Sequence, residues 1–248
     1  MKRKFLLVLA ILAVTCWAAV ASADMIVTDG GSPLTIPGSS GSLSASATFS
    51  LTGGVLTIVL TNTGAATTDP GGVLTALFFT PGAALTPLTA SLNNGSSVAT
   101  VYNGTFPTGG NVGGEWAYGS GLVGAPHSAI AGISSSGLSP LFGDSNFNGS
   151  NLTPPAALDG ANWGIVAAST TSTNNGFLNQ SPYANNFTLF TLSVEGNPNT
   201  LTLGNISFQY GTGLNEPNVP GVPIPPTVLL LGSGLLGLIA LGVRRRKE

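Results

Sequence analysis

ASATFSLTGGVLTIVL, which runs from Ala45 to Leu60, is the stretch that decides the fold class. Apolar residues alternate with Ser and Thr on both sides of a Gly-Gly pair: Ala45, Ala47, Phe49 and Leu51 before it, and Leu56, Ile58 and Leu60 after it. Successive side chains of a β-strand point to opposite faces, so this alternation is typical of strands with one buried face. The stretch predicts two half-buried strands.

The rest of the chain between Asp24 and Pro220 has the same character. It is rich in Gly, Ser, Thr and Asn, and it has no apolar stripe of helical period and helix length. Further strand-like runs are Val73 to Thr80, Ser97 to Tyr102, Trp163 to Ser169, Phe187 to Val194 and Leu201 to Tyr210. Asn-Gly pairs, which favour tight turns, punctuate the sequence. We therefore predict a mainly β protein, a β-sandwich-like exported domain.

Some details of the strand pattern are less regular. The alternation slips at Leu189-Phe190 and near Gly204-Asn205, and slips of this kind predict β-bulges. Gly-Gly-Val-Leu-Thr occurs at Gly53 to Thr57 and again at Gly71 to Thr75, which indicates neighbouring strands. Residues 109–155 are rich in Gly and Ser, so we expect long loops with weak strands there.

Basic residues are confined to the two ends of the chain. All seven Lys and Arg lie in Lys2-Arg3-Lys4 and in Arg244-Arg245-Arg246-Lys247. A domain with carboxylates and no basic side chain is repelled by phosphate, which excludes nucleic acid as a partner. The same distribution excludes Schiff-base lysines and arginine phosphate clamps from the domain between the ends.

The first 23 residues have the layout of a signal peptide. The basic start is followed by an apolar stretch from Phe5 to Val20 and then by Ala21-Ser22-Ala23. This order predicts a signal helix cleaved by signal peptidase after Ala23, with an uncleaved N-terminal anchor as the alternative. Cleavage also removes Cys16, the only cysteine, so the exported domain must be stable without disulfides.

The C-terminal residues form a second targeting segment with three parts. Val222-Pro223-Ile224-Pro225-Pro226 is followed by an uncharged segment, residues 227–243, and by a basic tail, residues 244–248. A helix over the uncharged segment would be about 25 Å long, close to the ~30 Å of a bilayer core. Basic residues after a span stay on the cytoplasmic side, so the sequence predicts a single transmembrane helix with the domain facing outward.

This tail resembles the PEP-CTERM sorting signal of Gram-negative bacteria, in a variant whose motif contains Pro without Glu. The helix sequence from Leu231 to Leu238, LGSGLLGL, is similar to that of the family, as are the Pro motif and Arg244, Arg245 and Arg246. The resemblance implies an exosortase-type transpeptidase as a partner and an association with exopolysaccharide. A membrane anchor that is never cut is the alternative. The run from Phe49 to Leu92 is also similar to the start of exosortase-dependent surface proteins.

The sequence offers few groups for catalysis. At least two of Glu115, Asp144, Asp159 and His127 would have to converge in a cleft to form a hydrolase site. His127 is not part of a nucleophile-elbow motif, so it fits a solvent-facing loop residue better. We predict no enzyme activity and no cofactor, and a secreted hydrolase is the least favoured alternative.

Two further motifs suggest ligands. Trp116, Tyr118 and Trp163 could form a sugar-stacking surface of a carbohydrate-binding adhesin, although large aromatic residues in a sandwich are more often core residues. Residues 144–149, DSNFNG, match the start of a calcium loop, but Pro155 occupies the position that needs a bidentate Glu. An Asx-turn explains the same residues, so we expect no metal site.

The sequence thus divides into a signal peptide (1–23), a β-rich exported domain (24–217) and a PEP-CTERM-like sorting signal (218–248). We expect a non-enzymatic protein exported across the inner membrane. It would be held there by the C-terminal helix, transiently or permanently, before display at the cell surface or in the extracellular matrix.

Overall fold

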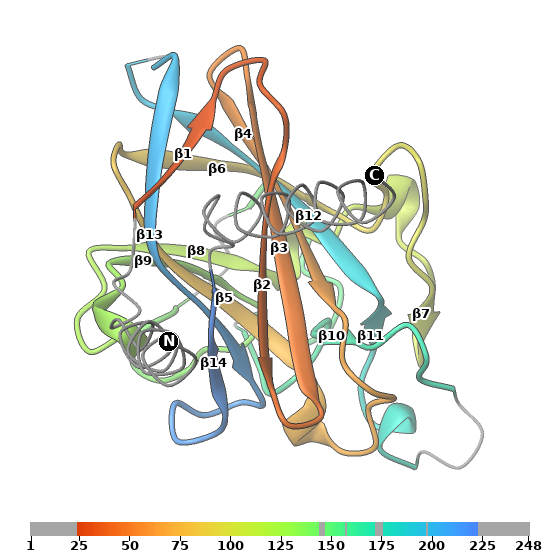
Figure 1. The fold of residues 1–248 in the computed structure, drawn as a ribbon. Helices are drawn as coiled ribbons and strands as arrows, with labels where there is room; N and C mark the ends of the chain where they lie inside the picture. The colour runs from red at the N-terminus through yellow and green to blue at the C-terminus, as the bar shows by residue number, and fades with distance from the viewer. Residues whose placement is uncertain (1–23, 144–146, 157, 172–175, 197, 223–248) are drawn as a thin grey trace, which may run out of the picture.

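Two β-sheets pack face to face in the computed structural model, which describes residues 24–143, 147–156, 158–171, 176–196 and 198–222 (Figure 1). The five-stranded sheet has the order β2 (Leu34–Ser40), β3 (Leu43–Thr52), β4 (Val55–Asn62), β12 (Phe187–Val194) and β6 (Leu85–Ser91). The main path of the nine-stranded sheet is β1 (Met25–Thr28), β13 (Thr200–Tyr210), β5 (Leu74–Pro81), β10 (Ile165–Val166), β11 (Tyr183–Asn185) and β7 (Val101–Tyr102). The chain is mainly β, and its two sheets are consistent with a β-sandwich.

Three short strands complete the nine-stranded sheet. They are β8 (Ala117–Ser120), which pairs with β9 (Ala131–Ser134), and β14 (Asn218–Pro220), which pairs with β13. The helical segments are single 3-10 turns: η1 (Pro70–Gly72), η2 (Thr108–Gly110), η3 (Gly113–Glu115), η4 (Pro126–Ser128) and η5 (Gly176–Asn179). Among the described residues, no helix is long and apolar enough to cross a membrane.

The main core lies between the sheets and is filled by the alternating residues of β3 and β4. The apolar positions predicted from the sequence are all buried: Ala45, Ala47, Phe49, Leu51, Leu56, Ile58 and Leu60. They pack in one cluster with Leu77 and Phe208 of the other sheet. Complete burial of a Leu or Phe side chain contributes about 1.5–3 kcal/mol, so this cluster holds the sheets together without a disulfide.

Strand β5 is buried on both faces. Leu77 and Phe79 point into the main core, whereas Ala76 and Phe78 belong to a second cluster on the outer face. There the ring of Phe78 lies 6.0 Å from that of Phe142. Residues 109–155 thus contain loops and the short strands β8 and β9, as expected; the strands extend the sheet beside β5, and loop residues such as Ala125, Leu138 and Phe142 cover this face.

The structure corrects three details of the predicted strands. The bulge near Gly204-Asn205 is confirmed, but the slip expected at Leu189-Phe190 lies between Thr191 and Leu192, in the pairing with β6. The two Gly-Gly-Val-Leu-Thr segments lead into β4 and β5, which belong to different sheets. The runs expected around Ser97 and Trp163 shrink to the short strands β7 and β10, because the neighbouring residues turn away into loops.

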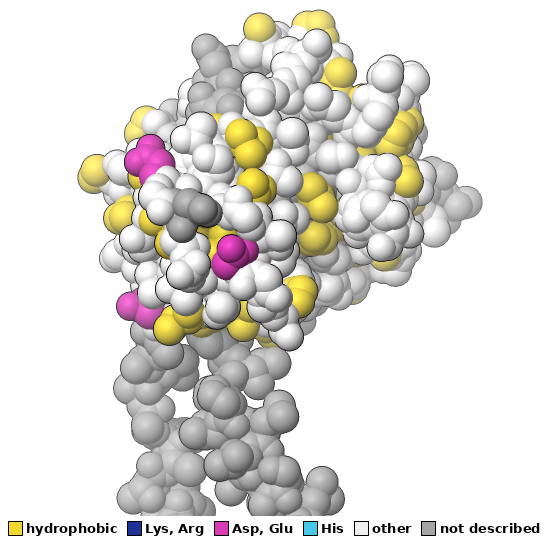
Figure 2. Space-filling model, turned by 90° about the horizontal axis from the view of Figure 1, so that it is seen from above, with side chains coloured by type: hydrophobic (Ala, Val, Ile, Leu, Met, Phe, Trp, Pro, Cys, Tyr) yellow, Lys and Arg dark blue, Asp and Glu magenta, His cyan; other side chains and the backbone are white. Residues whose placement is uncertain are grey.

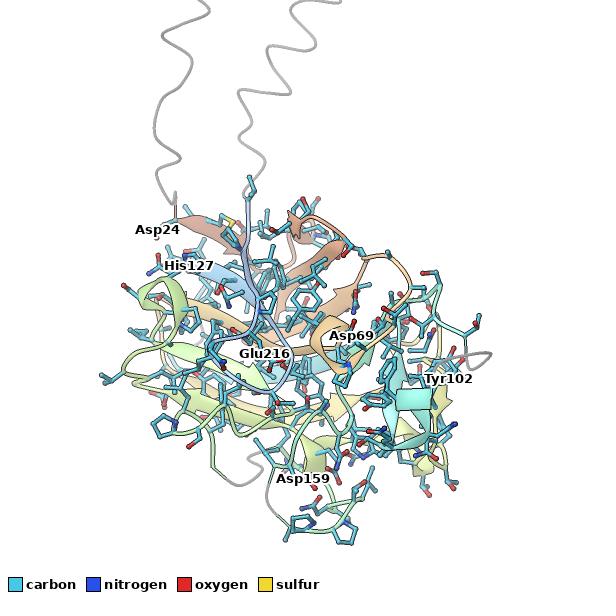
Figure 3. All side chains as sticks on the ribbon, turned by 90° about the horizontal axis from the view of Figure 1, so that it is seen from below. Asp24, Asp69, Tyr102, His127, Asp159 and Glu216 are labelled. Atoms are coloured by element: carbon cyan, nitrogen blue, oxygen red, sulfur yellow. The ribbon has the colours of Figure 1, made fainter. Side chains whose placement is uncertain are left out.

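Both ends of the folded domain lie on the same edge of β13. Strand β1 pairs with residues 200–203 of β13, and β14 pairs with residues 207–209. Between them, the N–H of Gly221 donates to the carbonyl oxygen of Ile206 at 2.8 Å. Asp24, the first described residue, is near the start of β1 on this side of the molecule, opposite Asp159 (Figure 3). The chain thus enters and leaves the domain on one side.

Several predicted targeting residues fall outside the described residues. These are Ala21 and Ala23 of the signal peptide, Pro223 to Pro226 of the motif, the predicted helix at 227–243, and Arg244, Arg245 and Arg246. Only Val222 of the sorting motif is described, and its side chain is partly exposed. Residues 218–222, grouped with the sorting signal from the sequence, are bonded to the sheet through β14.

Candidate functional site

An open cleft of about 700 Å³ lies at the surface of the domain. Its lining comes from the loop 103–108, from Asn111, from segment 150–153, and from Trp163 and Pro182. The volume lies within the range of about 300–1,000 Å³ that is typical of small-molecule sites. This cleft is therefore the candidate binding site.

Close backbone packing builds one wall of the cleft. A Cβ atom on Gly113 would approach the carbonyl oxygen of Asn148, and a Cβ atom on Gly114 would approach that of Ser150, both at distances no side chain tolerates. The two glycines let segment 113–115 lie directly against the segment that follows Asn148. Larger residues at these two positions would push the segments apart.

The buried carboxylate of Glu115 forms hydrogen bonds with the same wall. Oε1 of Glu115 accepts hydrogen bonds from the backbone N–H groups of Leu152 and Thr153. Burial raises the pKa of Glu115, which outweighs the lowering by these two hydrogen bonds, and repulsion from Asp159 raises the pKa further. Since the domain has no Lys or Arg to pair with it, Glu115 holds the loop through hydrogen bonds alone.

Trp163 lines the cleft although it is almost completely buried. Its side chain is only 3% exposed, and its Nε1–H donates to Oγ1 of Thr153 at 3.1 Å. Its backbone N–H donates to the carbonyl oxygen of Pro182 at 2.7 Å, and its φ of 58° is a left-handed conformation. Such a backbone conformation in a bulky residue is uncommon and persists only where the surrounding contacts enforce it.

The loop 103–108 supplies the exposed side of the cleft. Phe106 is 42% exposed, and the tip of its ring lies over Gly110, where an added Cβ would be 3.2 Å from Cζ of Phe106. Asn103, Thr105 and Thr108 are exposed on the same loop. Asn103 has a φ of 47°, which Asn tolerates better than most residues. The loop thus presents one aromatic ring among amide and hydroxyl groups.

The cleft is uncharged. None of the described residues that line it is ionisable; they are Asn, Thr, Ser, Gly, Pro, Leu, Phe and Trp. Figure 2 shows one outer face of the domain with a few separated carboxylates, scattered apolar side chains and no Lys or Arg. A ligand of this site would be recognised by hydrogen bonds and by contact with the ring and the apolar side chains, not by its charge.

The three aromatic residues expected to form a sugar-stacking surface do not do so. Trp116 and Tyr118 are buried in the main core, and the ring of Trp116 packs against Phe190 at 4.8 Å. Burial raises the pKa of Tyr118 to about 12. Trp163 is also buried but reaches the cleft. The structure supports the alternative interpretation of these aromatic side chains as core residues.

Phe106 is the cleft residue that the sequence patterns do not reveal. It follows Asn103-Gly104-Thr105 and precedes Pro107, so it belongs to no alternating run. An aromatic residue inside a stretch of turn-forming residues has no core-facing strand to occupy, and that is the signal by which it could have been found.

The residues considered for a hydrolase do not form a common site among those the structure describes. His127 is exposed in η4, as expected for a loop histidine, and lies far from Asp159 (Figure 3). Asp159 accepts a hydrogen bond from Nδ2 of Asn162 at 2.7 Å, and neither it nor Glu115 lines the cleft. Asp144 lies outside the described residues.

The calcium-loop motif can be followed only in part, since residues 144–146 are not described. The backbone N–H of Asn148 donates to the carbonyl oxygen of Leu88, and a Cβ atom on Gly149 would be 2.6 Å from Oδ1 of Asn111. This end of the motif is thus packed against β6 and the cleft wall. Within the described part of the chain, no three His, Cys, Asp or Glu residues gather as a metal site would require.

No protein-family model, curated protein or solved structure matches the chain. The site must therefore be interpreted from its own geometry.

Proposed function

We propose that this chain is a non-enzymatic protein that is exported and displayed at the outer side of a bacterial inner membrane, and then at the cell surface or in the extracellular matrix. A signal peptide ending at Ala23 would carry it across the membrane. The segment that starts at Val222 would hold it there until an exosortase-type transpeptidase removes the helix. Signal peptidase and the transpeptidase are the proposed processing partners.

One observation supports the proposal: the two ends of the folded domain, to which the proposed targeting segments would be joined, lie at the same edge of β13. Strand β1 follows Asp24 and β14 precedes Val222, and both pair with β13. A domain whose two ends leave on one side can be held at a membrane by either end and still present its other side. Asp159 lies on that other side (Figure 3). Glu115 interacts electrostatically with Asp159 and accepts a hydrogen bond from the backbone N–H of Thr153 in the cleft wall, so the cleft is near this side of the domain.

The charge distribution supports the same function. Lys and Arg occur only in the terminal segments, where they orient signal and anchor helices, and the domain itself has none. The resemblance of the tail to the PEP-CTERM signal implies exopolysaccharide as the surroundings of the displayed domain. A weakly charged exterior rich in hydroxyl and amide groups is compatible with such a hydrated matrix.

Cell fractionation with surface proteolysis tests the display. The full chain would be expressed in a Gram-negative host that has an exosortase, next to a variant in which Pro223, Pro225 and Pro226 are Ala. We expect the unaltered chain at the surface or in the medium and the variant retained in the inner membrane, with its domain accessible from the periplasm. Recovery of the unaltered chain from the cytoplasm would contradict the proposal.

A second candidate, a carbohydrate-binding adhesin, is favoured by the cleft and not by the three aromatic residues Trp116, Tyr118 and Trp163. The cleft combines an exposed ring, Phe106, with uncharged polar groups. The two functions are compatible, since an adhesin must also be displayed.

A further inference from the structure

We propose that the cleft between loop 103–108 and segment 150–153 binds a neutral saccharide chain. The inference deepens the proposed function, because it names the class of ligand that the displayed domain would hold. It concerns a different set of residues from the three aromatic side chains that the sequence suggests, of which only Trp163 reaches the cleft.

Charge decides between classes of ligand. A site for an anionic polymer needs Lys or Arg, and the domain has neither. A site for a cationic ligand needs carboxylates, and no Asp or Glu occurs in the described lining of the cleft. The lining therefore fits an uncharged ligand with many polar groups best, and a neutral saccharide is such a ligand.

The polar groups of the lining suit hydroxyl groups. Asn111 is exposed, and its Oδ1 is occupied by the N–H of Gly113 at 2.8 Å, so its Nδ2 is the group available to a ligand. Asn103 offers a complete amide, and Thr105 and Thr108 offer hydroxyl groups. Amides and hydroxyls both donate and accept, which matches a ligand whose hydroxyl groups do the same.

Phe106 supplies the apolar part of the contact. Its large apolar ring is partly exposed, and Leu152, which is 38% exposed, lines the same cleft. Sugar rings have apolar C–H faces, and an aromatic ring against such a face gains contact area and dispersion energy. The cleft therefore offers both an apolar surface and hydrogen-bonding groups.

Hydrogen bonds hold segment 150–153 in place at the cleft. Glu115 fixes the N–H groups of Leu152 and Thr153, and Trp163 fixes the hydroxyl of Thr153. A preformed site loses less conformational entropy on binding than a mobile one. Glu115 and Trp163 thus act as positioning residues for the wall, without contact of the carboxylate with the ligand.

Calorimetric titration of the full chain in detergent tests this site. The probes are cellohexaose, maltohexaose and chitohexaose, which are neutral, and hexagalacturonate, which is anionic. The variants are Phe106→Ala, Asn103→Gly and the control Val123→Ala. Glycine keeps the positive φ of Asn103 while removing its amide. Val123 is an 88% exposed apolar residue outside the cleft.

We expect saturable binding of at least one neutral hexasaccharide and none of hexagalacturonate. Phe106→Ala should weaken the binding about tenfold, as the loss of a central aromatic contact does, and Asn103→Gly should weaken it severalfold. Val123→Ala should leave it unchanged. The proposal is overturned if no neutral hexasaccharide binds, if hexagalacturonate binds equally well, or if Phe106→Ala binds like the unaltered chain.

Surface proteolysis of the same variants separates this inference from the proposed function. Phe106→Ala should reach the surface like the unaltered chain and lose only saccharide binding. If the unaltered chain is displayed but binds none of the neutral probes, the display stands and the saccharide site is wrong.

Discussion

The backbone N–H of Val222 donates a hydrogen bond to the carbonyl oxygen of Pro37, at 2.8 Å. Val222 is the first residue of the proposed sorting motif, and Pro37 lies in the middle of β2, in the other sheet. The folded domain therefore holds the chain up to the motif itself. A transpeptidase that needs an extended substrate would find it only beyond this bond, in the motif or after it.

Gly38 lets the exit strand pass over β2. An added Cβ would lie 2.7 Å from the carbonyl oxygen of Pro220 and 2.8 Å from the ring of Phe208. Gly38→Ala should therefore lower the free energy of unfolding by about 1–3 kcal/mol, with roughly 2–4 °C in Tm for each kcal/mol. Thermal unfolding measures this, and Gly143→Ala, in open space, is the control. Equal Tm values for the two variants would show that the exit strand does not pack as described.

Asn62 connects the two sheets through its buried amide. Nδ2 donates to the carbonyl oxygens of Ile165, at 2.9 Å, and Gly72, while Oδ1 accepts from the N–H of Gly64. Asn62→Ala leaves these buried groups without partners, so it should destabilise the domain by roughly 1–3 kcal/mol. Urea unfolding measures the change. Asn199→Ala, at an exposed position, should have little effect, and a similar loss in both variants would contradict the bridging role.

Glu115 should make stability depend on pH. Burial raises its pKa above the ordinary value of 4.5, so folding favours the protonated form. The contribution to stability is complete below the ordinary pKa and is lost as the pH rises through the raised pKa of the folded state. A tenfold difference between the acid dissociation constants of the folded and unfolded states corresponds to about 1.4 kcal/mol. Glu115→Gln keeps the acceptor oxygen but cannot ionise.

Urea unfolding of both chains from about pH 4 to about pH 8 checks this expectation. The stability of the unaltered chain relative to Glu115→Gln should fall over this range. Glu195→Gln, at an exposed position, controls for the loss of one acid. A relative stability that rises with pH would show that the hydrogen bonds from Leu152 and Thr153 outweigh burial.

Buried tyrosines should resist ionisation. Burial raises the pKa of Tyr118 to about 12 and also raises the pKa values of Tyr183 and Tyr210. Since the raised pKa belongs to the folded state, Tyr118 contributes to stability up to about pH 10 and loses that contribution as the pH rises toward 12. Tyr183 and Tyr210 act in the same direction. Ultraviolet titration should give a higher tyrosine midpoint for the folded chain than for the same chain in urea. Coincident midpoints would be inconsistent with the burial.

The alternation of apolar and polar residues was sufficient to predict β3, β4 and β12, because one face of each lies in the core. Strand β13 was also predicted, although its C-terminal half is buried on both faces. The alternation failed for β2 and β6. Both strands contain a proline, Pro37 in β2 and Pro87 in β6, and a proline in the sequence usually indicates that a strand is interrupted. Here the prolines are tolerated because both strands lie at sheet edges, where a missing N–H leaves no partner strand without a hydrogen bond. Whether a strand lies at an edge depends on the topology, which local alternation does not contain.

The candidate site could not be predicted in the same way. Its wall depends on the contact of Gly113 and Gly114 with residues far along the chain, and its exposed ring, Phe106, lies in a loop without period. Trp163 was identified as a candidate, but its position depends on Thr153 and Pro182, which no local pattern connects to it. The shape of this site depends on packing between loops that are far apart in the sequence, which a local pattern does not contain.

The measurement that tests the central claim most directly is the intact mass, with sequencing of both terminal peptides, of the protein recovered from the cell surface and medium. The proposal predicts a chain that begins at Asp24 and ends between Val222 and Pro226. A chain that begins at Asp24 and still ends at Glu248 would make it an ordinary membrane-anchored surface protein and would contradict processing by a transpeptidase. A chain that keeps Met1 and is found inside the cell would contradict the export itself.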